Sequence, residues 1–496
     1  QESLRQLHYP HVHADLHQLQ DQVSPAKLRL VLEELIAHQL TLKRAKQQNQ
    51  RLPAPALALR RHLEQGLIKN LPFELTGAQQ KVWQEVATDL KTTVPMVRMV
   101  QGDVGSGKTV LAALAACRAV DHGCQVAVLA PTEILAEQHF HNFSHWLEPL
   151  GINVVWLTGK QKAQVKRQSL AAIASGEGQV IVGTHALFQE AVEYQHLGLI
   201  IIDEQHRFGV AQRHSLVKKA PPGKGLHQLV MTATPIPRTL AMSAYGDLDH
   251  SLIDELPPGR KPINSVLLNN TKRAEVIERI HLASNSGQQV YWICPLIEAS
   301  EVLQCEAAQD TAALLTQQLN NIKVGLVHGR LSGNEKAEVM AQFKAGYIQL
   351  LVATTVVEVG VDVPNANLMV IDNAERLGLA QLHQLRGRVG RGQAQSYCLF
   401  MYQAPLSAMG RERLDILRQS NDGFVIAERD LQLRGPGEVL GTRQAGAVGL
   451  RIADLMRDAH LLPEVKVIAE GYINYSHKTE KIISRWVGEN QAFAKV

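Results

Sequence analysis

The sequence lacks the features that mark secreted, zinc-binding and membrane-spanning proteins. Its five cysteines are scattered and form no C-x-x-C pair, which argues against a zinc site or a disulfide framework and for a reducing compartment. No apolar run reaches the roughly 18 residues that a membrane-spanning helix requires, and no secretory signal peptide is visible. These absences predict a cytoplasmic protein without a membrane segment.

The sequence also lacks an initiator methionine and a strong charge imbalance. It opens with Gln1, so we expect an N-terminal truncation. Its 51 Lys and Arg against 47 Asp and Glu give a net charge of +4, which permits a nucleic-acid partner without requiring one. A chain of 496 residues is too long for one core, and this length predicts about three domains.

What the sequence does have is a glycine-rich segment that fits the phosphate-binding pattern G-x-x-x-x-G-K-[ST]. Its residues are Gly102, Asp103, Val104, Gly105, Ser106, Gly107, Lys108 and Thr109. The apolar run Val97–Val100 predicts a strand entering this segment, and Val110–Val120 predicts a helix leaving it. This order lets backbone N–H groups close on an anion at a helix N-terminus. We therefore expect Lys108 to reach the β- and γ-phosphates of a nucleotide and the Thr109 hydroxyl to hold Mg²⁺, the alternative being a glycine-rich turn without a ligand.

Residues 1–70 have the pattern of a helical connector. Apolar side chains recur at helical spacing over Leu28–Ile36, directly after a Ser-Pro pair that predicts a helix start. We expect this connector to pack without carrying chemistry.

Phe73 and Gln79 stand in the run L-P-F-E-L-T-G-A-Q, ahead of the glycine-rich segment. The amide of Gln79 matches the N6/N7 edge of adenine, and the ring of Phe73 could stack on the base. By itself the run would favour a surface glutamine, but ahead of a phosphate-binding loop it predicts an adenine contact.

Two series of apolar, β-branched runs alternate with helical segments, so we predict an α/β protein with two parallel sheets covered on both faces. The first series is Val97–Val100, Val126–Ala130, Val154–Leu157, Val180–Val182, Leu199–Ile202 and Leu229–Met231. After a domain change near Pro257-Pro258-Gly259, the second is Val266–Leu268, Val290–Cys294, Val324–Val327, Leu350–Ala353, Leu368–Ile371 and Tyr397–Met401.

The ligand sites of such sheets lie at the carboxyl ends of strands, and an acidic pair follows Leu199–Ile202 there. An acid at the end of an apolar strand beside a phosphate-binding loop completes a Mg²⁺ shell, which assigns Asp203 to the metal. The next carboxylate, Glu204, can orient and deprotonate the attacking water. Two such acids otherwise often cap the following helix.

The second series has no phosphate-binding loop but carries Arg386, Arg388 and Arg391 in the run Q-L-R-G-R-V-G-R. Three arginines so close together could form a solvated face. Because they alternate with glycine and a nucleotide site exists elsewhere in the chain, they suit the capture of a γ-phosphate by guanidinium groups.

In this order the motifs resemble those of superfamily 2 helicases. The set comprises the Gln79 run, the glycine-rich segment, D-E-Q-H at 203–206, T-A-T-P at 232–235, the segment 358–362 and Gln384–Arg391. The extension D-E-Q-H-R-F-G-V, together with E-R-D-L-Q-L-R-G-P-G-E at 428–438 and G-T-R-Q at 441–444, narrows the resemblance to the RecG family of bacterial ATP-dependent DNA helicases.

The resemblance implies two tandem RecA-like lobes that clamp ATP–Mg²⁺, with Arg388 and Arg391 reaching the γ-phosphate from the second lobe. Further nucleotide contacts are implied for Gln205, His206, Gly360, Asp362 and Gln384. A translocation motif is implied in which Arg413 and Arg434 belong to a helical hairpin and Gln444 to the loop after it. The expected limits are 1–70 for the connector, 71–256 and 257–405 for the two lobes, and 406–496 for the hairpin and C-terminal helices.

The implied activity is ATP-dependent translocation on double-stranded DNA that reverses stalled forks and migrates Holliday junctions. Implied partners are branched DNA and single-strand DNA-binding protein, for a monomer at the nucleoid of a bacterial cytoplasm. The family carries an N-terminal wedge domain of OB-like fold, where this sequence has only the helical connector. An RNA helicase is one alternative, and a nucleotide-gated scaffold without turnover is another, although Lys108, Glu204 and Arg391 are all present.

Overall fold

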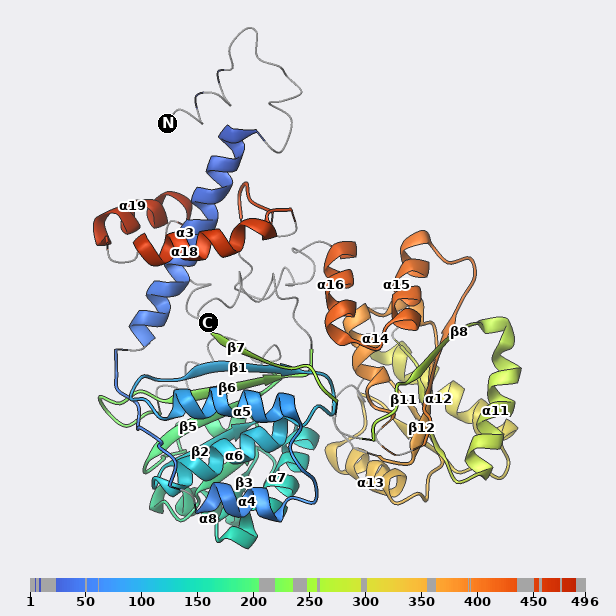
Figure 1. Cartoon of the computed structure of the whole chain (residues 1–496). Coiled ribbons are helices and arrows are strands. Elements are labelled where there is room, and N and C mark those ends of the chain that lie inside the picture. Colours follow the sequence, from blue (N-terminus) through green and yellow to red (C-terminus); the bar gives the residue numbers. More distant parts are fainter. Residues whose placement is uncertain are drawn as a thin grey trace.

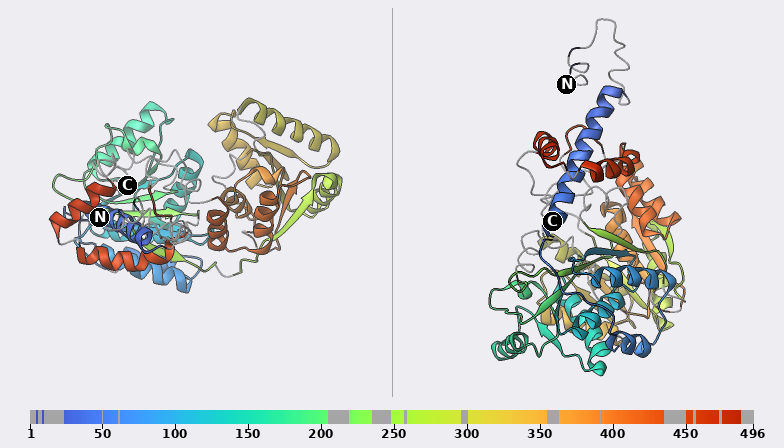
Figure 2. Two further views of the ribbon diagram at one scale, coloured as in Figure 1. Left: turned by 90° about the horizontal axis from the view of Figure 1, so that it is seen from above. Right: turned by 60° about the vertical axis from the view of Figure 1, so that its left-hand side comes forward.

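The computed structural model of the chain consists of two α/β lobes and a helical unit made from both ends of the chain (Figure 1). The lobes lie side by side, and the view from above shows the same arrangement (Figure 2). The structure describes residues 5, 9, 24–49, 51–60, 62–204, 219–234, 248–256, 259–295, 301–354, 363–390, 392, 394–434, 450–454, 457–472 and 475–487.

The first lobe is built on a seven-stranded parallel sheet with the strand order β3-β4-β2-β5-β6-β1-β7. Its strands are β1 Val97–Gly102, β2 Gln125–Leu129, β3 Val154–Leu157, β4 Val180–Gly183, β5 Leu197–Asp203, β6 His227–Thr232 and β7 Asp249–Ile253. The first predicted series is therefore confirmed. The sequence analysis missed β7, because this edge strand is short, begins with Asp and His, and buries only part of its side chains.

Among the described residues, this lobe also contains α4 Leu63–Asn70, α5 Gly77–Leu90, α6 Lys108–Asp121, α7 Glu133–Leu147 and α8 Ala163–Ser175. Alanine-rich α6 is buried along nearly its whole length, since small side chains let it pack closely in the core. The same core includes Leu57 and Leu67, and Glu64 of α4 forms a buried 2.9 Å ion pair with Arg118 of α6. Leu57, Glu64 and Leu67, which belong to the predicted connector, thus pack with the first lobe.

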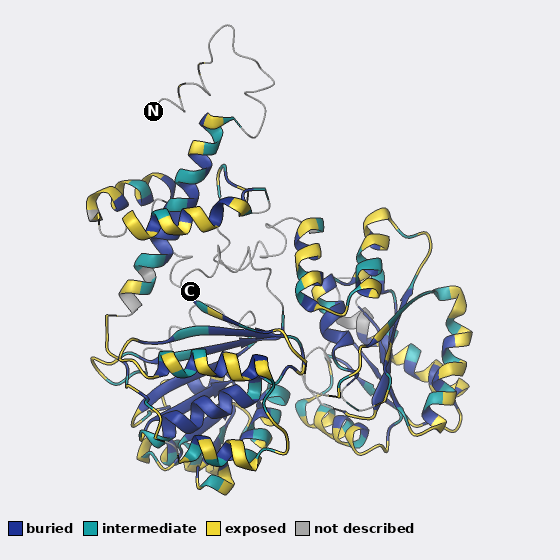
Figure 3. Cartoon of the chain, viewed as in Figure 1, coloured by how far each residue is buried: buried dark blue, intermediate teal, exposed yellow. Residues whose placement is uncertain are grey.

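The second lobe contains a six-stranded parallel sheet with the order β10-β11-β9-β12-β13-β8. Its strands are β8 Asn264–Asn269, β9 Gln289–Ile293, β10 Val324–Val327, β11 Leu350–Ala353, β12 Ala366–Ile371 and β13 Tyr397–Tyr402, which confirms the second series. The sheet is packed with α11 Arg273–Asn285, α12 Glu301–Gln318, α13 Gly333–Lys344 and α14 Leu379–Arg386. In both lobes the strands are mostly buried and the helices turn exposed side chains outward (Figure 3).

A helical hairpin, α15 Ala408–Gln419 and α16 Gly423–Arg434, follows the second sheet. Leu414 and Leu417 of α15 and Ile426 of α16 belong to the same buried core as β9, β12 and α14. The hairpin is therefore an integral part of the second lobe, and a movement of that lobe carries the hairpin with it.

The N-terminal helix α3 Pro25–Asn49 packs on the C-terminal helices α18 Leu462–Tyr472 and α19 Ser476–Trp486. The predicted Ser-Pro start of α3 is confirmed, because the Ser24 hydroxyl accepts a hydrogen bond from the Lys27 N–H. The fully buried Glu34 carboxylate accepts hydrogen bonds from three successive backbone N–H groups, those of Arg451, Ile452 and Ala453. The two ends of the chain are thereby fastened together.

Replacing this carboxylate with an amide, Glu34→Gln, is expected to loosen the helical unit. An amide nitrogen cannot accept the backbone N–H groups, so the free energy of unfolding of the unit should fall by about 3 kcal/mol. Hydrogen exchange of α18 and α19 measures this loss. The matched control is Glu33→Gln, whose partner Arg485 is solvent-exposed, and it should cost no more than about 1 kcal/mol. Equal rates of hydrogen exchange in α18 and α19 of the two variants would show that Glu34 does not fasten the chain ends.

All five cysteines are buried and unbridged, as their scatter in the sequence predicts. Among the described residues, no helix is long and apolar enough to cross a membrane.

Candidate active site

The glycine-rich segment forms a tight loop between β1 and α6, in the predicted strand-loop-helix order. Gly107 has φ of 86°, and a Cβ there would collide with the Gln79 amide nitrogen. A Cβ on Gly102 would lie 2.5 Å from the Ser106 hydroxyl. Only glycine therefore fits at these two positions, and the backbone can curl closely around an anion at the N-terminus of α6.

Lys108 is buried and folds back over this loop. Its Nζ donates hydrogen bonds to the carbonyl oxygens of Gly102 at 2.6 Å and Asp103 at 2.9 Å. The ammonium group thus lies inside the cradle, where the negative charge of a bound phosphate would be neutralised.

Gln79 is buried next to the loop and has a role that the sequence analysis did not predict. Its Oε1 accepts a hydrogen bond from the Thr76 N–H at 2.9 Å, within a capping box at the start of α5. Its Nε2 donates to the Ser106 carbonyl at 2.8 Å. One end of the amide therefore caps α5 and the other holds this helix against the loop. The adenine contact stays a prediction. The half-exposed Phe73 lines a nearby cavity of 720 Å³.

The two acids after β5 are held in different ways. The Asp203 carboxylate is buried, with Oδ2 2.7 Å from Nε2 of His139 on α7. Burial works to raise the pKa of Asp203, but the hydrogen bond and charge of His139 and the charge of Lys108 lower it overall. The influence of Lys108 shows that the loop and the end of β5 share one site.

Glu204 adopts a left-handed backbone conformation with φ of 52°, which directs its carboxylate to the end of β6. One carboxylate oxygen accepts a hydrogen bond from the Thr232 hydroxyl at 3.4 Å and the other from the Ala233 N–H at 3.3 Å. Burial, followed by the charge of Asp203, raises the pKa of Glu204 to about 7. The acids after β5 and the residues at the end of β6 therefore meet at one edge of the sheet.

Thr109 and Asp203 are suited to hold Mg²⁺. Thr109 lies in the first turn of α6 directly after Lys108, and Lys108 acts electrostatically on Asp203. A hydroxyl and a carboxylate are oxygen donors of the kind that Mg²⁺ prefers, with water and phosphate oxygens completing its octahedron.

The second lobe contributes to this site through the segment at the end of α14. Gln384 is buried on α14, and Arg388 follows this helix. The positive charge of Arg388 opposes the rise in the pKa of Glu204 that burial and Asp203 cause, so this arginine lies within electrostatic reach of the first lobe's acids. The predicted residues Gln205, His206, Gly360, Asp362, Arg391 and Gln444 lie outside the described part of the chain.

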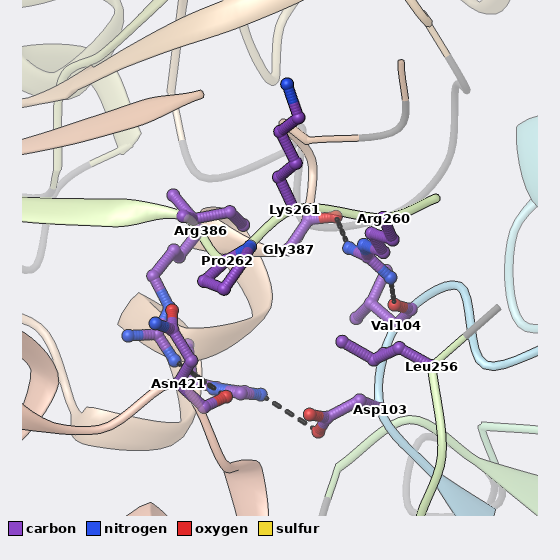
Figure 4. A pocket seen from close by; sticks show the side chains of 11 residues that line it. Asp103, Val104, Leu256, Arg260, Lys261, Pro262, Arg386, Gly387 and Asn421 are labelled. Atoms are coloured by element: carbon purple, nitrogen blue, oxygen red, sulfur yellow. Dashed lines mark hydrogen bonds and ion pairs between the residues drawn. The ribbon is translucent and has the colours of Figure 1, made fainter. Parts of the chain in front are cut away.

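Two residues that the sequence analysis did not single out bridge the lobes. His383 Nε2 lies 3.1 Å from a carboxylate oxygen of Asp103. Arg260 donates hydrogen bonds to the Val104 carbonyl of the loop and, at 3.5 Å, to the Gly387 carbonyl (Figure 4). Arg260 directly follows the P-P-G run at the domain change. This position between the two lobes is the feature of the sequence that could have pointed to Arg260.

The hairpin is also tied to the second lobe by a predicted translocation residue. Arg413 of α15 donates to the carbonyl oxygens of Glu375 at 3.0 Å and Leu377 at 3.5 Å. Its guanidinium group is therefore directed into the protein. Arg434 is the last residue of α16.

Three protein-family profiles match successive parts of the chain. They are the DEAD/DEAH box helicase at residues 76–243, the helicase conserved C-terminal domain at 272–393, and the C-terminal part of domain 3 of the ATP-dependent DNA helicase RecG at 420–485. The first match covers β1 to β6 of the first sheet, and the second covers β9 to β12 of the second sheet. The third covers the hairpin's second helix and the C-terminal helices.

Similar proteins carry the same family name over nearly the whole chain. The ATP-dependent DNA helicase RecG of Escherichia coli strain K12 is 54% identical over 496 residues, which is 99% of this chain and 72% of that protein. The RecG protein of Haemophilus influenzae is 52% identical with the same coverage.

A solved structure of RecG bound to a three-way DNA junction superposes with a TM-score of 0.71 at 42% identity, covering 88% of this chain. This chain spans only 57% of the length of the chain in that complex. The shared lobes, the RecG-specific C-terminal profile and the high identity agree. The chain belongs to the RecG family of ATP-dependent DNA helicases.

Proposed function

We propose that this chain is an ATP-driven translocase on double-stranded DNA that remodels branched DNA, through fork reversal and Holliday junction branch migration. The observation that carries the proposal is a composite site at which the second lobe contacts the loop. His383 lies 3.1 Å from Asp103, and Arg260 donates to the carbonyl oxygens of Val104 and Gly387. The loop lysine Lys108 and the acids Asp203 and Glu204 come from the first lobe, and Arg388 of the second lobe acts on Glu204 electrostatically. The junction-bound relative supports branched DNA as the substrate.

The residues have distinct tasks in hydrolysis. The loop N–H groups and Lys108 bind the β- and γ-phosphates, and Glu204 positions the attacking water and accepts its proton. Thr109 and Asp203 hold Mg²⁺, which neutralises charge on the phosphate oxygens when it is bound. Arg388 stabilises the charge that develops on the γ-phosphate in the transition state.

Because the site needs both lobes, the binding and loss of ATP change the free energy of lobe closure. The hairpin shares the second lobe's core and is anchored by Arg413, so closure moves the hairpin along the DNA. The predicted monomeric state, the location at the nucleoid, the adenine contacts and the single-strand DNA-binding protein partner stay predictions.

The test is ATP turnover measured with fork DNA, linear duplex and single-stranded RNA side by side, together with regression of a labelled fork. We expect fork DNA to stimulate turnover most strongly and the fork to regress only with ATP. Equal stimulation by RNA would favour an RNA-remodelling ATPase instead. Absence of turnover with saturating fork DNA would favour a nucleotide-gated scaffold.

Arg413→Ala is expected to lower the number of base pairs migrated per ATP by about tenfold, since each lost guanidinium hydrogen bond weakens the anchor of the hairpin. The readout is branch migration and ATP turnover in the same sample. Arg411→Ala on the same helix removes an exposed guanidinium group and serves as the matched control. An unchanged ratio in the Arg413 variant would refute the anchoring role.

A further inference from the structure

A buried arginine connects α14 to the turn of the hairpin. Arg386 is only 2% exposed, and its Nη1 donates to the carbonyl oxygens of Leu417 at 2.9 Å and Ser420 at 2.7 Å. Its Nη2 donates to the Asn421 carbonyl at 3.3 Å. The guanidinium group thus binds the last carbonyls of α15 and the turn after it, where a cation also complements the negative end of the helix dipole.

The same guanidinium group fixes the state of His383, one helical turn away on α14. Arg386 Nη2 lies 3.1 Å from His383 Nδ1, and burial, together with the charges of Arg386 and Arg260, lowers the pKa of His383 to about 3. The imidazole is therefore neutral. Because Nδ1 accepts a hydrogen bond from the arginine, Nε2 carries the proton and donates it to the Asp103 carboxylate.

Asp103 belongs to the phosphate-binding loop, yet its side chain faces the hairpin. Its carboxylate accepts from His383 at 3.1 Å. Burial raises the pKa of Asp103 overall, while the charge of Lys108 and the backbone N–H of Gly423, the first residue of α16, act to lower it. Arg386 and Asp103 thus place a positive charge at the end of α15 and a carboxylate at the start of α16. Figure 4 shows Asp103, Arg386 and Asn421 around one small pocket between the lobes.

We propose that Asp103 and His383 are positioning residues that couple the phosphate-binding loop directly to the turn of the hairpin. This inference deepens the proposed function and rests on it. Lys108 donates to the backbone carbonyl of Asp103 in this arrangement, and binding of phosphates redirects N–H donors of its ammonium group toward the anion. A change at the nucleotide then alters the position of Asp103, and the path through His383 and Arg386 transmits it to both helices of the hairpin.

The experiment compares Asp103→Ala, His383→Leu and the double variant by base pairs migrated per ATP hydrolysed. This ratio is independent of any slower turnover that a change in the loop causes. Each single variant should lower the ratio about tenfold, the effect of losing one charge-assisted hydrogen bond. The double variant should be no worse than either single variant, because both break the same path. His383→Gln should recover most of the ratio, since an amide can accept from Arg386 and donate to Asp103.

A second measurement does not depend on activity. Hydrogen exchange in the first turn of α16 should become faster in Asp103→Ala without nucleotide, whereas Glu412→Ala, which removes an exposed carboxylate from α15, should leave it unchanged. The inference is wrong if the double variant loses the product of the two single losses in base pairs migrated per ATP. It is also wrong if Asp103→Ala changes neither this ratio nor hydrogen exchange in the first turn of α16. If the unaltered chain regresses no fork, the proposed function itself fails, and this outcome is distinct from the others.

Discussion

Lys108→Ala should reduce ATP hydrolysis by roughly 10³-fold or more, since preorganised positive charge at the phosphates supplies much of the rate enhancement in phosphoryl transfer. The Lys108 ammonium group lies in the loop, within reach of the carbonyl oxygens that a bound phosphate would replace as its partners. The loop should also bind ATP less tightly. Steady-state turnover with fork DNA and equilibrium binding of a labelled ATP analogue measure the two effects.

The fold of this variant should persist, because α6 is held by its apolar core residues. Thermal unfolding checks this expectation. The matched control is Lys91→Ala, which removes an exposed lysine just after α5 and should hydrolyse ATP at the unaltered rate. Turnover within tenfold of the unaltered chain in a folded Lys108 variant would contradict the assignment of this loop.

Arg388→Ala should lower kcat by about 10³- to 10⁵-fold, the contribution of an arginine that stabilises the transition state of phosphoryl transfer. KM for ATP should change little, because the arginine acts mainly on charge that develops during the reaction. Arg388→Lys should recover only part of the rate, since an ammonium group cannot form a bidentate contact. Turnover at saturating ATP and fork DNA is the measurement.

Arg279→Ala removes an exposed arginine from α11 of the same lobe and controls for net charge. A rise in KM with unchanged kcat in the Arg388 variant would place this residue in substrate binding alone. It would also remove the reason for hydrolysis to depend on the closure of the two lobes.

The elements themselves could be predicted from local pattern. Buried parallel strands are continuous apolar runs, which can be recognised in a sequence, and every strand predicted in this way is present in the structure. The edge strand β7 was not predicted, because it is partly polar. The glycine-rich loop was equally predictable, because the spacing of its residues is itself a local pattern. The contacts that require glycine are only partly local, since a Cβ at Gly107 would collide with Gln79, outside the loop.

The partners of the site residues were less predictable. The adenine contact of Gln79 stays a prediction, but the hydrogen bonds of its amide with Thr76 and Ser106 were not predicted from its place in the sequence. Whether two groups form a hydrogen bond depends on the angle between donor and acceptor as much as on the distance between them. The spacing of residues in the sequence does not reveal that angle.

The sequence by itself determined the two sheets, the glycine-rich loop and the acids at the strand ends, since each depends on neighbouring residues and on a repeat of apolar side chains. Only the tertiary structure decided that Asp103 meets His383, that Arg386 binds the hairpin turn, and that α3 joins α18 and α19. These contacts join segments that lie far apart in the chain. Their formation depends on how two lobes and two chain ends pack, and no local periodicity encodes that packing.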